Sequence, residues 1–485
     1  MFSLNIKPQY IPARYFSFCV LLTVLLVTLS IRSLQGELFI TDAQYMVAAG
    51  RWIIANGHLP TTDPLSIHSE LTYICQQYPI CILVAVLYDT FGEMSVRLFF
   101  ALLDMVAVLF IWYQTFPKAG NRILHCAVSC VFGAVIVYSL RSTPRALDIL
   151  CLAVSWELME KYIKSRDIRF LFGFPFLGIC IANLHGALWP CAIMLPLAAL
   201  LDSKLDPNAR AALAVTILLT IASAMLNPYG LDVLSLPFKT IGTSDIATVA
   251  VPELKPMFSI VPVEAVILIV ISVVPVIFHA KCLGFKKTVF SFETMMISGL
   301  LFLSLMTWRN ELLLLGILMI VYSTWCWKLE PKCKVSSKML SRIVLFSISV
   351  VALEFGAVLF YSTLSATDQK SISIERAFQA MREDGAVSGT AVLTDIDPGC
   401  RAELNGFKPY LDTRIEVFNG QKNVLAEAGK ALSSGSLSAI CDDYGMDYAV
   451  LNYGINDVGI QDLEESGFKP VYSDNLTVCL KRSTV

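Results

Sequence analysis

The sequence predicts an α-helical polytopic membrane protein of about eleven transmembrane helices, followed by a soluble α/β domain at its C-terminal end. Of its 485 residues, 56% are hydrophobic and only 16% are charged, and the mean hydropathy is +0.65, unlike a soluble domain. Apolar runs long enough to span a bilayer recur as far as Leu364. After about Ser365, charged residues become frequent and short β-type runs alternate with helical ones.

The first apolar run, Tyr15–Leu34, is preceded by Lys7 and Arg14, as in a signal peptide. No small-residue cleavage site follows it, so we interpret it as a retained helix. The later runs predicted to span are 96–116, 123–140, 146–163, 170–184, 187–201, 211–226, 263–279, 289–308, 311–327 and 339–364.

Basic residues predict the orientation of these helices. With a cytoplasmic N-terminus, the inner loops are rich in lysine and arginine and the outer loops are poor in them, as in a plasma (inner) membrane protein. An odd number of spans then places the C-terminal domain, residues 365–485, outside the cytoplasm. The transmembrane domain is residues 1–364.

This topology requires residues 35–95 to form one long outer loop. Within it, Tyr78–Leu87 is apolar but too short to span, which predicts a helix lying in the membrane interface. Asp42–Asn56 is predicted to form a second interfacial helix, ended by Gly57.

The predicted strands of the C-terminal domain are short. They are 390–394, 408–411, 448–452, 470–472 and 477–480. This domain has no GxGxxG and no P-loop, so nothing in it suggests nucleotide binding.

The net charge and the cysteine pattern limit the partners and metal sites that the sequence predicts. The formal net charge is −2 and no basic run occurs, which excludes a nucleic-acid partner. The fourteen cysteines show no CxxC pair or Cys/His cluster, so they predict no metal site. Four cysteines are expected outside the cytoplasm, where disulfides persist, and a Cys400–Cys441 bond is left open; they are Cys75, Cys81, Cys400 and Cys441.

Ionisable and polar residues fall at the predicted outer ends of the helices, where apolar segments rarely keep them without a functional reason. They are expected to share one pocket at the non-cytoplasmic boundary, and arginine suits a phosphate or pyrophosphate because of its planar fork. The set is Glu37, Asp42, His58, Asp63, His68, Glu70, Arg97, Arg141, Arg145, Asp148, Asn183, His185, Asn227, Tyr229, Arg309 and Asn310.

An outward-facing site has no ATP or nucleotide sugar at hand. Group transfer there needs a donor delivered within the membrane, such as a sugar on a polyprenyl phosphate. A carboxylate could take the proton of an acceptor hydroxyl while arginine or histidine stabilises the departing phosphate, and this single displacement inverts the sugar carbon.

Motifs along nearly the whole chain resemble those of bacterial membrane proteins in the GT-C glycosyltransferase superfamily, in a largely uncharacterised branch. The matching segments are Asp42-Ala-Gln-Tyr45, Gly50-Arg51-Trp52, Gly57-His58-Leu59-Pro60, Thr62-Asp63-Pro64-Leu65-Ser66, Arg141-Ser-Thr-Pro-Arg145, Ala182-Asn183-Leu184-His185-Gly186, Asn227-Pro228-Tyr229-Gly230, Arg309-Asn310 and Tyr410-Leu-Asp412-Thr-Arg414-Ile-Glu416-Val-Phe418.

The resemblance implies a GT-C fold that transfers a sugar from a polyprenyl-phosphate donor to a cell-envelope acceptor, a glycan, lipid or protein. It implies that Asp42 is the catalytic carboxylate residue, acting as general base. A divalent metal is left open. The substrate-binding residues are expected to be Arg309, His185, Arg141, Arg145, Asp63, Asn183 and Tyr229, the arginines and His185 on the phosphate side.

Structural roles compete with these assignments. Asp42 could cap its helix, and Asp63 before Pro64 is a common turn signal. His185 could be a packed histidine, and Arg145 could pair with Asp148 one turn later. Arg141, Arg145 and Arg309 could simply anchor helix ends in the headgroups.

Two other functions remain open. Acids within the predicted spans, Asp104, Glu157, Glu293 and Glu354, would serve a proton path in a transporter or lipid flippase, although pairing inside the bundle is the simpler expectation. A catalytically inactive GT-C relative acting as an assembly partner is the other alternative. Relatives usually carry an aromatic, a histidine and an acid before the interfacial helix, where this chain has Tyr73-Ile-Cys-Gln-Gln-Tyr78.

Overall fold

The computed structural model describes residues 10–34, 41–140, 143–240, 252–325, 337–364, 367–419, 424–454 and 456–483. Contacts between Cα atoms divide the chain into two compact units. The bundle unit comprises Met1–Leu34, Ala101–Gly230 and Glu253–Leu364, and the sheet unit comprises Gln35–Phe100, Leu231–Pro252 and Ser365–Val485. The predicted boundary between residues 364 and 365 stays a prediction, because the contacts group the outer loop with the C-terminal segment.

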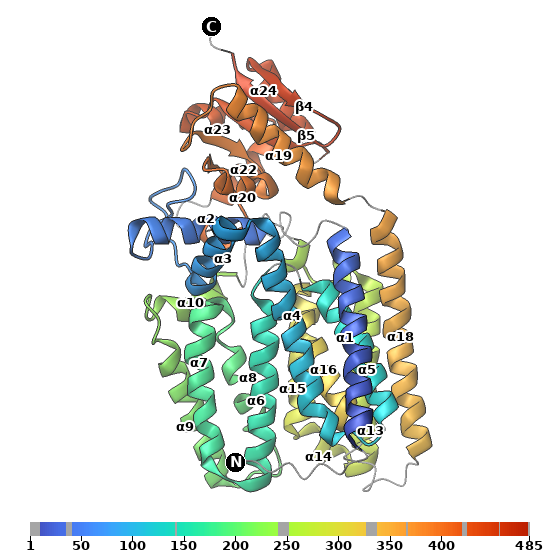
Figure 1. Cartoon of the computed structure of the whole chain (residues 1–485). Helices are drawn as coiled ribbons and strands as arrows, with labels where there is room; N and C mark the ends of the chain where they lie inside the picture. The colour runs from blue at the N-terminus through green and yellow to red at the C-terminus, as the bar shows by residue number, and fades with distance from the viewer. Residues whose placement is uncertain are drawn as a thin grey trace. The chain divides into compact units, whose positions relative to one another are not determined.

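The bundle unit is built from helices, and α1, α5 and α18 run side by side within it (Figure 1). Its longer helices are α1 (Tyr10–Leu34), most of α4 (Glu93–Thr115), α5 (Arg122–Ser139), α6 (Arg145–Ser165), α7 (Gly173–Leu184), α8 (Cys191–Ala199), α9 (Pro207–Ala224), α13 (Pro262–Leu283), α15 (Phe292–Met306), α16 (Glu311–Ile320) and α18 (Ser337–Leu364). The short ones are η1 (Phe116–Lys118), η2 (Ile168–Phe172), η3 (Gly186–Leu188), η4 (Pro252–Leu254), α12 (Met257–Ile260), α14 (Phe285–Val289), η5 (Trp308–Asn310) and the π-helical η6 (Val321–Trp325).

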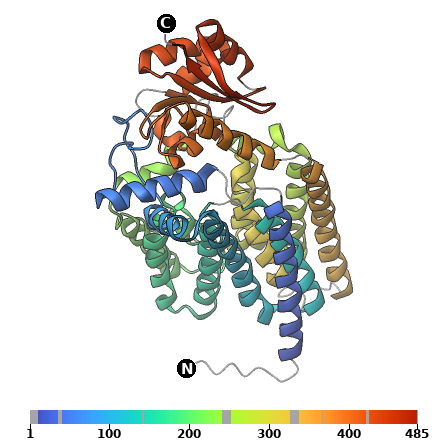
Figure 2. The same cartoon turned by 45° about the horizontal axis from the view of Figure 1, so that its top comes forward.

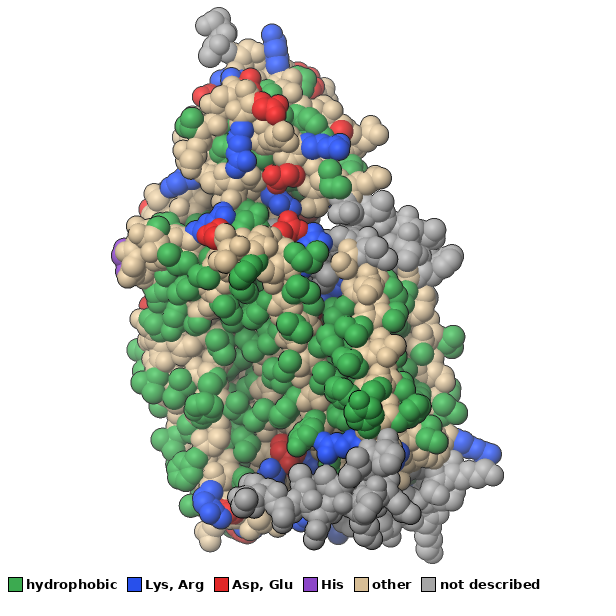
Figure 3. All heavy atoms as spheres, viewed as in Figure 1, with side chains coloured by type: hydrophobic (Ala, Val, Ile, Leu, Met, Phe, Trp, Pro, Cys, Tyr) green, Lys and Arg blue, Asp and Glu red, His purple; other side chains and the backbone are tan. Residues whose placement is uncertain are grey.

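A helix lies at each predicted span, and the chain is a multi-pass membrane protein. Five helices in the described part are long and apolar enough to cross a membrane by length and composition, so the count of eleven spans stays a prediction. On the visible face in Figure 3, hydrophobic side chains cover most of the bundle helices, and charged ones gather at their ends.

Acidic side chains inside the bundle unit are paired. Arg32 and Asp104 are fully buried, with Arg32 Nη1 3.1 Å from Asp104 Oδ2. Lys118 binds Glu157, and Glu293 lies 3.8 Å from the ammonium of Lys204. Pairing was the simpler expectation for these acids, and the side chain of Glu354 lies outside the described residues.

The sheet unit joins a five-stranded sheet to the helices of the outer loop. The strand order is β2-β1-β3-β5-β4, with β1 parallel to β2 and β3, and β5 antiparallel to β3 and β4. Figure 2 draws strands of this sheet as arrows in the orange and red of the C-terminal segment. The strands are β1 (Ala391–Thr394), β2 (Lys408–Pro409), β3 (Tyr448–Asn452), β4 (Phe468–Ser473) and β5 (Thr477–Arg482). The helices are α2 (Thr41–Asn56), α3 (Tyr78–Phe91), α10 (Asp232–Thr240), α19 (Thr367–Glu383), α20 (Ile396–Leu404), α21 (Ile415–Phe418), α22 (Val424–Ser434), α23 (Leu437–Tyr444) and α24 (Asp457–Glu465).

All five predicted strands are confirmed, and so is the helix predicted at 42–56. Gly57 ends α2 at a φ of 70°, a left-handed conformation that favours glycine. The second loop helix, α3, has 14 residues and is apolar but short, as predicted.

Two glycines allow close packing within the sheet unit. A Cβ at Gly50 of α2 would lie 2.0 Å from the carbonyl oxygen of Cys81 in α3, and a Cβ at Gly399 would lie 1.8 Å from that of Leu411. Helices α2 and α3 therefore touch backbone to backbone.

The cysteines expected outside the cytoplasm carry free thiols. Cys400 and Cys441 are buried and unbonded, and the sulfurs of Cys75 and Cys81 lie 3.8 Å apart. The Cys400–Cys441 bond that the sequence left open is therefore not formed in this structure.

Candidate functional site

A buried histidine–aspartate pair lies at one end of the bundle unit. His185 directly follows the end of α7, and Asp148 lies in the first turn of α6. His185 Nδ1 is 2.8 Å from Asp148 Oδ2, and both side chains are almost completely buried. With Nδ1 donating to the carboxylate, the ring is fixed in orientation and Nε2 is left for another partner.

Two arginines interact electrostatically with the aspartate of the His185–Asp148 pair. Asp148 interacts electrostatically with Arg145 and Arg309, so all four charged or ionisable groups belong to one cluster. Arg145 could have paired with Asp148 by spacing, but its Nη2 binds Glu253 Oε2 at 2.7 Å, and no Arg145–Asp148 ion pair is found among the described residues. Arg309 lies in η5, half-buried, and the predicted site residue Arg141 lies outside the described residues.

The ends of α7 and α9 are clamped by two asparagines. Asn183 Nδ2 donates to the carbonyl of Leu226 at 3.0 Å. Asn227 Nδ2 donates to the carbonyl of Ala182 at 2.6 Å, and its Oδ1 accepts from the backbone of Tyr229 at 2.9 Å. These bonds join the ends of α7 and α9 beside His185 and Tyr229.

Asp42 lies in the first turn of α2, which begins one residue earlier at Thr41. The helix dipole stabilises a carboxylate there, whether or not the side chain caps the helix. Asp42 and Glu416 both act electrostatically on the buried Tyr45, whose hydroxyl accepts a hydrogen bond from Gln77. The sheet unit therefore brings two carboxylates to the beginning of α2.

Glu416 was not predicted as a site residue, although its motif was noted. It lies in α21, and its Oε1 accepts from Gln76 Nε2 at 3.3 Å. Gln76 belongs to the segment in which the family resemblance leads one to expect an acid. A carboxylate from the C-terminal domain is therefore present beside that segment.

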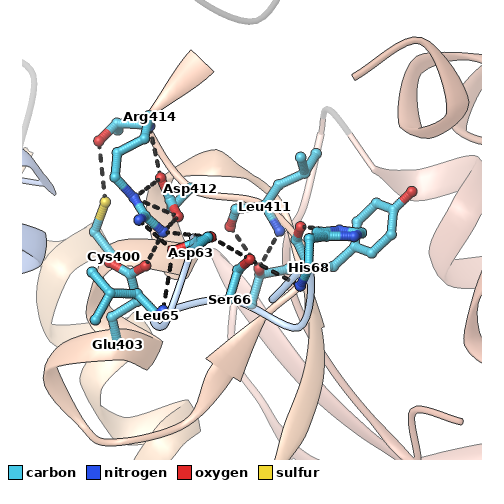
Figure 4. A network of polar contacts seen from close by, with 12 residues as sticks. Asp63, Leu65, Ser66, His68, Cys400, Glu403, Leu411, Asp412 and Arg414 are labelled. Carbon is cyan, nitrogen blue, oxygen red and sulfur yellow. Dashed lines mark hydrogen bonds and ion pairs between the residues drawn. The ribbon is translucent and has the colours of Figure 1, made fainter. Parts of the chain in front are cut away.

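Asp63 belongs to a buried network around Arg414 (Figure 4). The guanidinium binds three carboxylates, Asp63 at 2.7 Å, Asp412 at 2.5 Å and Glu403 at 2.7 Å. Asp63 also accepts from Ser66 Oγ at 2.6 Å, as expected for a turn. Its carboxylate is fully buried and engaged, so its predicted contact with substrate stays a prediction.

Two acids of the network have pKa values shifted in opposite directions. Burial would raise the pKa of Asp63, but the charge and hydrogen bonds of Arg414 hold it below its usual value. Burial raises the pKa of Glu403 well above its usual value despite Arg414. The ionised form is therefore favoured at Asp63 and disfavoured at Glu403.

The loop is fixed to the C-terminal segment by further bonds. His68 is buried, and its Nε2 donates to the carbonyl of Tyr410 at 3.1 Å, while burial lowers its pKa. The backbone N–H of Ile67 donates to Pro409 at 3.2 Å. His68 was expected with the outer-end polar residues, and it serves here to dock the loop.

Sequence reasoning missed Glu253, Glu403 and Arg414 as partners of site residues. A single glutamate in a short segment has no periodic signal, and partners 351 positions apart, such as Asp63 and Arg414, leave no local pattern. Among the described residues, no group of three or more His, Cys, Asp or Glu side chains is placed to hold a metal ion.

No family model matches the sequence, and no curated protein matches it. Solved structures do match in fold. An oligosaccharyltransferase from Archaeoglobus fulgidus, solved with a tethered acceptor peptide, aligns over 97% of this chain and 74% of its own, at 11% identity and a TM-score of 0.56. ArnT from Cupriavidus metallidurans, bound to undecaprenyl phosphate, aligns over 96% and 97%, at 13% identity and a TM-score of 0.53. The chain has the GT-C glycosyltransferase fold.

Proposed function

We propose that this chain is a membrane glycosyltransferase that moves a sugar from a polyprenyl-phosphate donor to a cell-envelope acceptor on the extracytoplasmic side of the membrane. The observation that carries the proposal is a cluster of two arginines and a buried His185–Asp148 pair at one end of a GT-C bundle. ArnT, a protein of this fold, binds undecaprenyl phosphate, which supports the donor class.

The cationic cluster binds the donor phosphate. Arg145 and Arg309 supply positive charge, and the Glu253 contact holds Arg145 in place. The Asp148 carboxylate binds Nδ1 of His185 and leaves Nε2 of the same ring for the donor phosphate. Arg141, Asn183 and Tyr229 complete the substrate-binding set that the sequence predicts.

Asp42 acts as the general base. It takes the proton of an acceptor hydroxyl while the hydroxyl oxygen forms a bond to the anomeric carbon of the sugar. The bond from that carbon to the phosphate oxygen breaks, and polyprenyl phosphate leaves with the electron pair, stabilised by the arginines. The sugar carbon inverts in this single displacement.

Glu416 supplies the second carboxylate of the reaction. Its hydrogen bond to Gln76 and its electrostatic effect on Tyr45 support a position near the beginning of α2, close to the base. In this chain the acid comes from the C-terminal domain, so the Gln76-Gln77 sequence is compatible with an active enzyme.

The test uses the full chain in proteoliposomes with undecaprenyl-phosphate sugars and an envelope extract. Mass spectrometry measures release of undecaprenyl phosphate, with and without EDTA because a divalent metal is left open. We expect Asp42→Asn to reduce release at least a hundredfold while donor binding is kept, and Arg309→Ala to weaken donor binding. Asp89→Asn, an exposed aspartate paired with Arg51, is the matched control and keeps full release.

Other outcomes separate the alternatives. Unchanged release in Asp42→Asn removes Asp42 from the mechanism. Donor binding with no transfer by the unaltered chain indicates an inactive relative, and transport of a labelled lipid without sugar transfer indicates a flippase. Asp104, Glu157 and Glu293 are each paired with a basic side chain. Within the described part of the chain, these three acids therefore offer no proton path for a flippase.

A further inference from the structure

A cavity of about 200 Å³ opens in the C-terminal part of the sheet unit, and none of the residues discussed as a transferase site explains it. Its wall is aliphatic, and its polar residues gather at one side. The aliphatic residues are Leu393, Ile396, Leu411, Leu425, Leu432, Leu437 and Leu451.

The cavity lies where the sheet topology favours ligand binding. Strands β1 and β3 are parallel neighbours, and the cavity is lined by residues that end or follow them, including Thr394 and Asn452. After β1 the chain continues to β2, which lies on one side of the β1–β3 pair. After β3 it continues to β4 and β5, which lie on the other side. Such a switch point leaves a crevice at the carboxyl ends of the strands, where ligands of open α/β sheets bind.

The polar side of the cavity is rich in acceptors. Asp395 is half-buried and accepts from Asn456 Nδ2 at 2.6 Å and from Asn452 Nδ2 at 3.2 Å. Asn456 is only 1% exposed, so its side chain holds the carboxylate from beneath the cavity wall.

The half-buried carboxylate of Asp395 has amide partners but no salt bridge among the residues the structure describes. Two charged groups also line the cavity, Asp397 and Lys370, and they neutralise each other in an ion pair of 2.6 Å. The polar side therefore offers the Asp395 carboxylate, beside an aliphatic wall, to a cationic donor.

We propose that this cavity binds a small amphipathic amine, its ammonium on Asp395 and its apolar body among the leucines. Size supports this class, since an apolar cavity of about 150 Å³ accommodates benzene and this one is slightly larger. The inference stands apart from the proposed function, because binding here requires no sugar transfer.

The probe is benzylamine, compared with benzyl alcohol and benzoate of the same shape. Ligand-observed NMR measures binding to the full chain in detergent. We expect benzylamine to bind with a dissociation constant of roughly millimolar order, benzyl alcohol about tenfold more weakly and benzoate not detectably. Equal binding of all three, or no binding of benzylamine, overturns the proposal.

Variants locate the binding. Asp395→Asn is expected to remove the preference for the amine over the alcohol, whereas Ala428→Trp fills the cavity and removes both. The control is Asp443→Asn, an exposed aspartate of the same unit, with unchanged binding. Amine binding that survives Ala428→Trp places the ligand elsewhere and refutes the site.

A pH titration of the unaltered chain provides a readout that does not depend on a variant folding. Burial, with Asp397 nearby and Lys370 opposing, raises the pKa of Asp395 to about 6. The carboxylate is therefore ionised at pH 7.5 and protonated at pH 5, while the amine stays charged. We expect amine binding to weaken about tenfold between these values, and a flat profile contradicts the contact with Asp395.

Discussion

Removal of the Arg414 charge is expected to detach the outer loop from the C-terminal segment of the sheet unit. Arg414→Met leaves Asp63 and Asp412 as buried carboxylates without a counter-charge, and both are fully buried. Breaking a buried ion pair in this way costs about 3–5 kcal/mol. The loss acts on the docked loop, because Asp63 belongs to the loop and Arg414 does not.

Hydrogen exchange measured by mass spectrometry on the solubilised full chain reports this opening. The amides of Ile67 and Tyr73 are bonded to Pro409 and Thr61, at 3.2 Å and 3.0 Å, so residues 61–73 exchange when the loop opens. A cost of 3–5 kcal/mol lowers protection by roughly two to three and a half orders of magnitude.

Two further variants test the opposite pKa shifts of Asp63 and Glu403. Asp63→Asn removes a charge partner and is expected to cost about 1.5–3 kcal/mol. Burial disfavours the ionised form of Glu403, so Glu403→Gln is expected to cost less, about 1 kcal/mol. Asp89→Asn, about half-exposed, is the control with a change of about 1 kcal/mol at most.

The pH dependence has a definite sign. The folded-state pKa of Glu403 lies above its ordinary value of 4.5, so its contribution is complete below that value and is lost as pH rises through the raised pKa. Loop protection, corrected for intrinsic exchange, should fall as the pH rises through the raised pKa of Glu403 in the unaltered chain, and should fall less in Glu403→Gln. If Glu403→Gln costs as much as Asp63→Asn, the opposite shifts of the two acids are refuted.

Two predictions concern packing and charge elsewhere. Gly50→Ala places a methyl 2.0 Å from the Cys81 carbonyl, which should cost about 1–3 kcal/mol and lower the melting temperature. The control is Gly299→Ala, where a Cβ would meet nothing within 4 Å, so the melting temperature should be unchanged or raised. Equal shifts in the two variants would contradict the close contact. Arg32→Met should cost about 3–5 kcal/mol, because it leaves the Asp104 carboxylate buried without its partner. Adding Asp104→Leu should restore most of the thermal stability. A double variant that is no more stable than Arg32→Met refutes the pairing.

Local pattern was sufficient for much of the fold. Short β-type runs predicted all five strands, because β-branched, aromatic and apolar residues gather locally in them. Helix α2 was predicted with its end at Gly57, because a helix stop requires only a nearby glycine. The number of spans was not settled, because helices such as α8, with Pro196, are too short to decide by length.

The candidate site was predicted only in part. Positions such as His185 and Arg145 were found because polar residues at the ends of apolar helices are rare. Their partners were not predicted: Asp148 was considered as a possible partner of Arg145, and the structure pairs Arg145 with Glu253. Spacing along a helix gives candidates for pairing, but the geometry of neighbouring segments selects among them.

The sequence by itself determined the membrane character, the helical and strand segments and the identity of the polar groups available for chemistry, because these follow from composition and short-range periodicity. Only the tertiary structure decided which groups meet. Asp63 of the loop and Arg414 of the tail, Gln76 and Glu416, and the leucines around Asp395 lie far apart in sequence. Their contacts depend on how the chain packs, since buried charges must find partners wherever the fold supplies them.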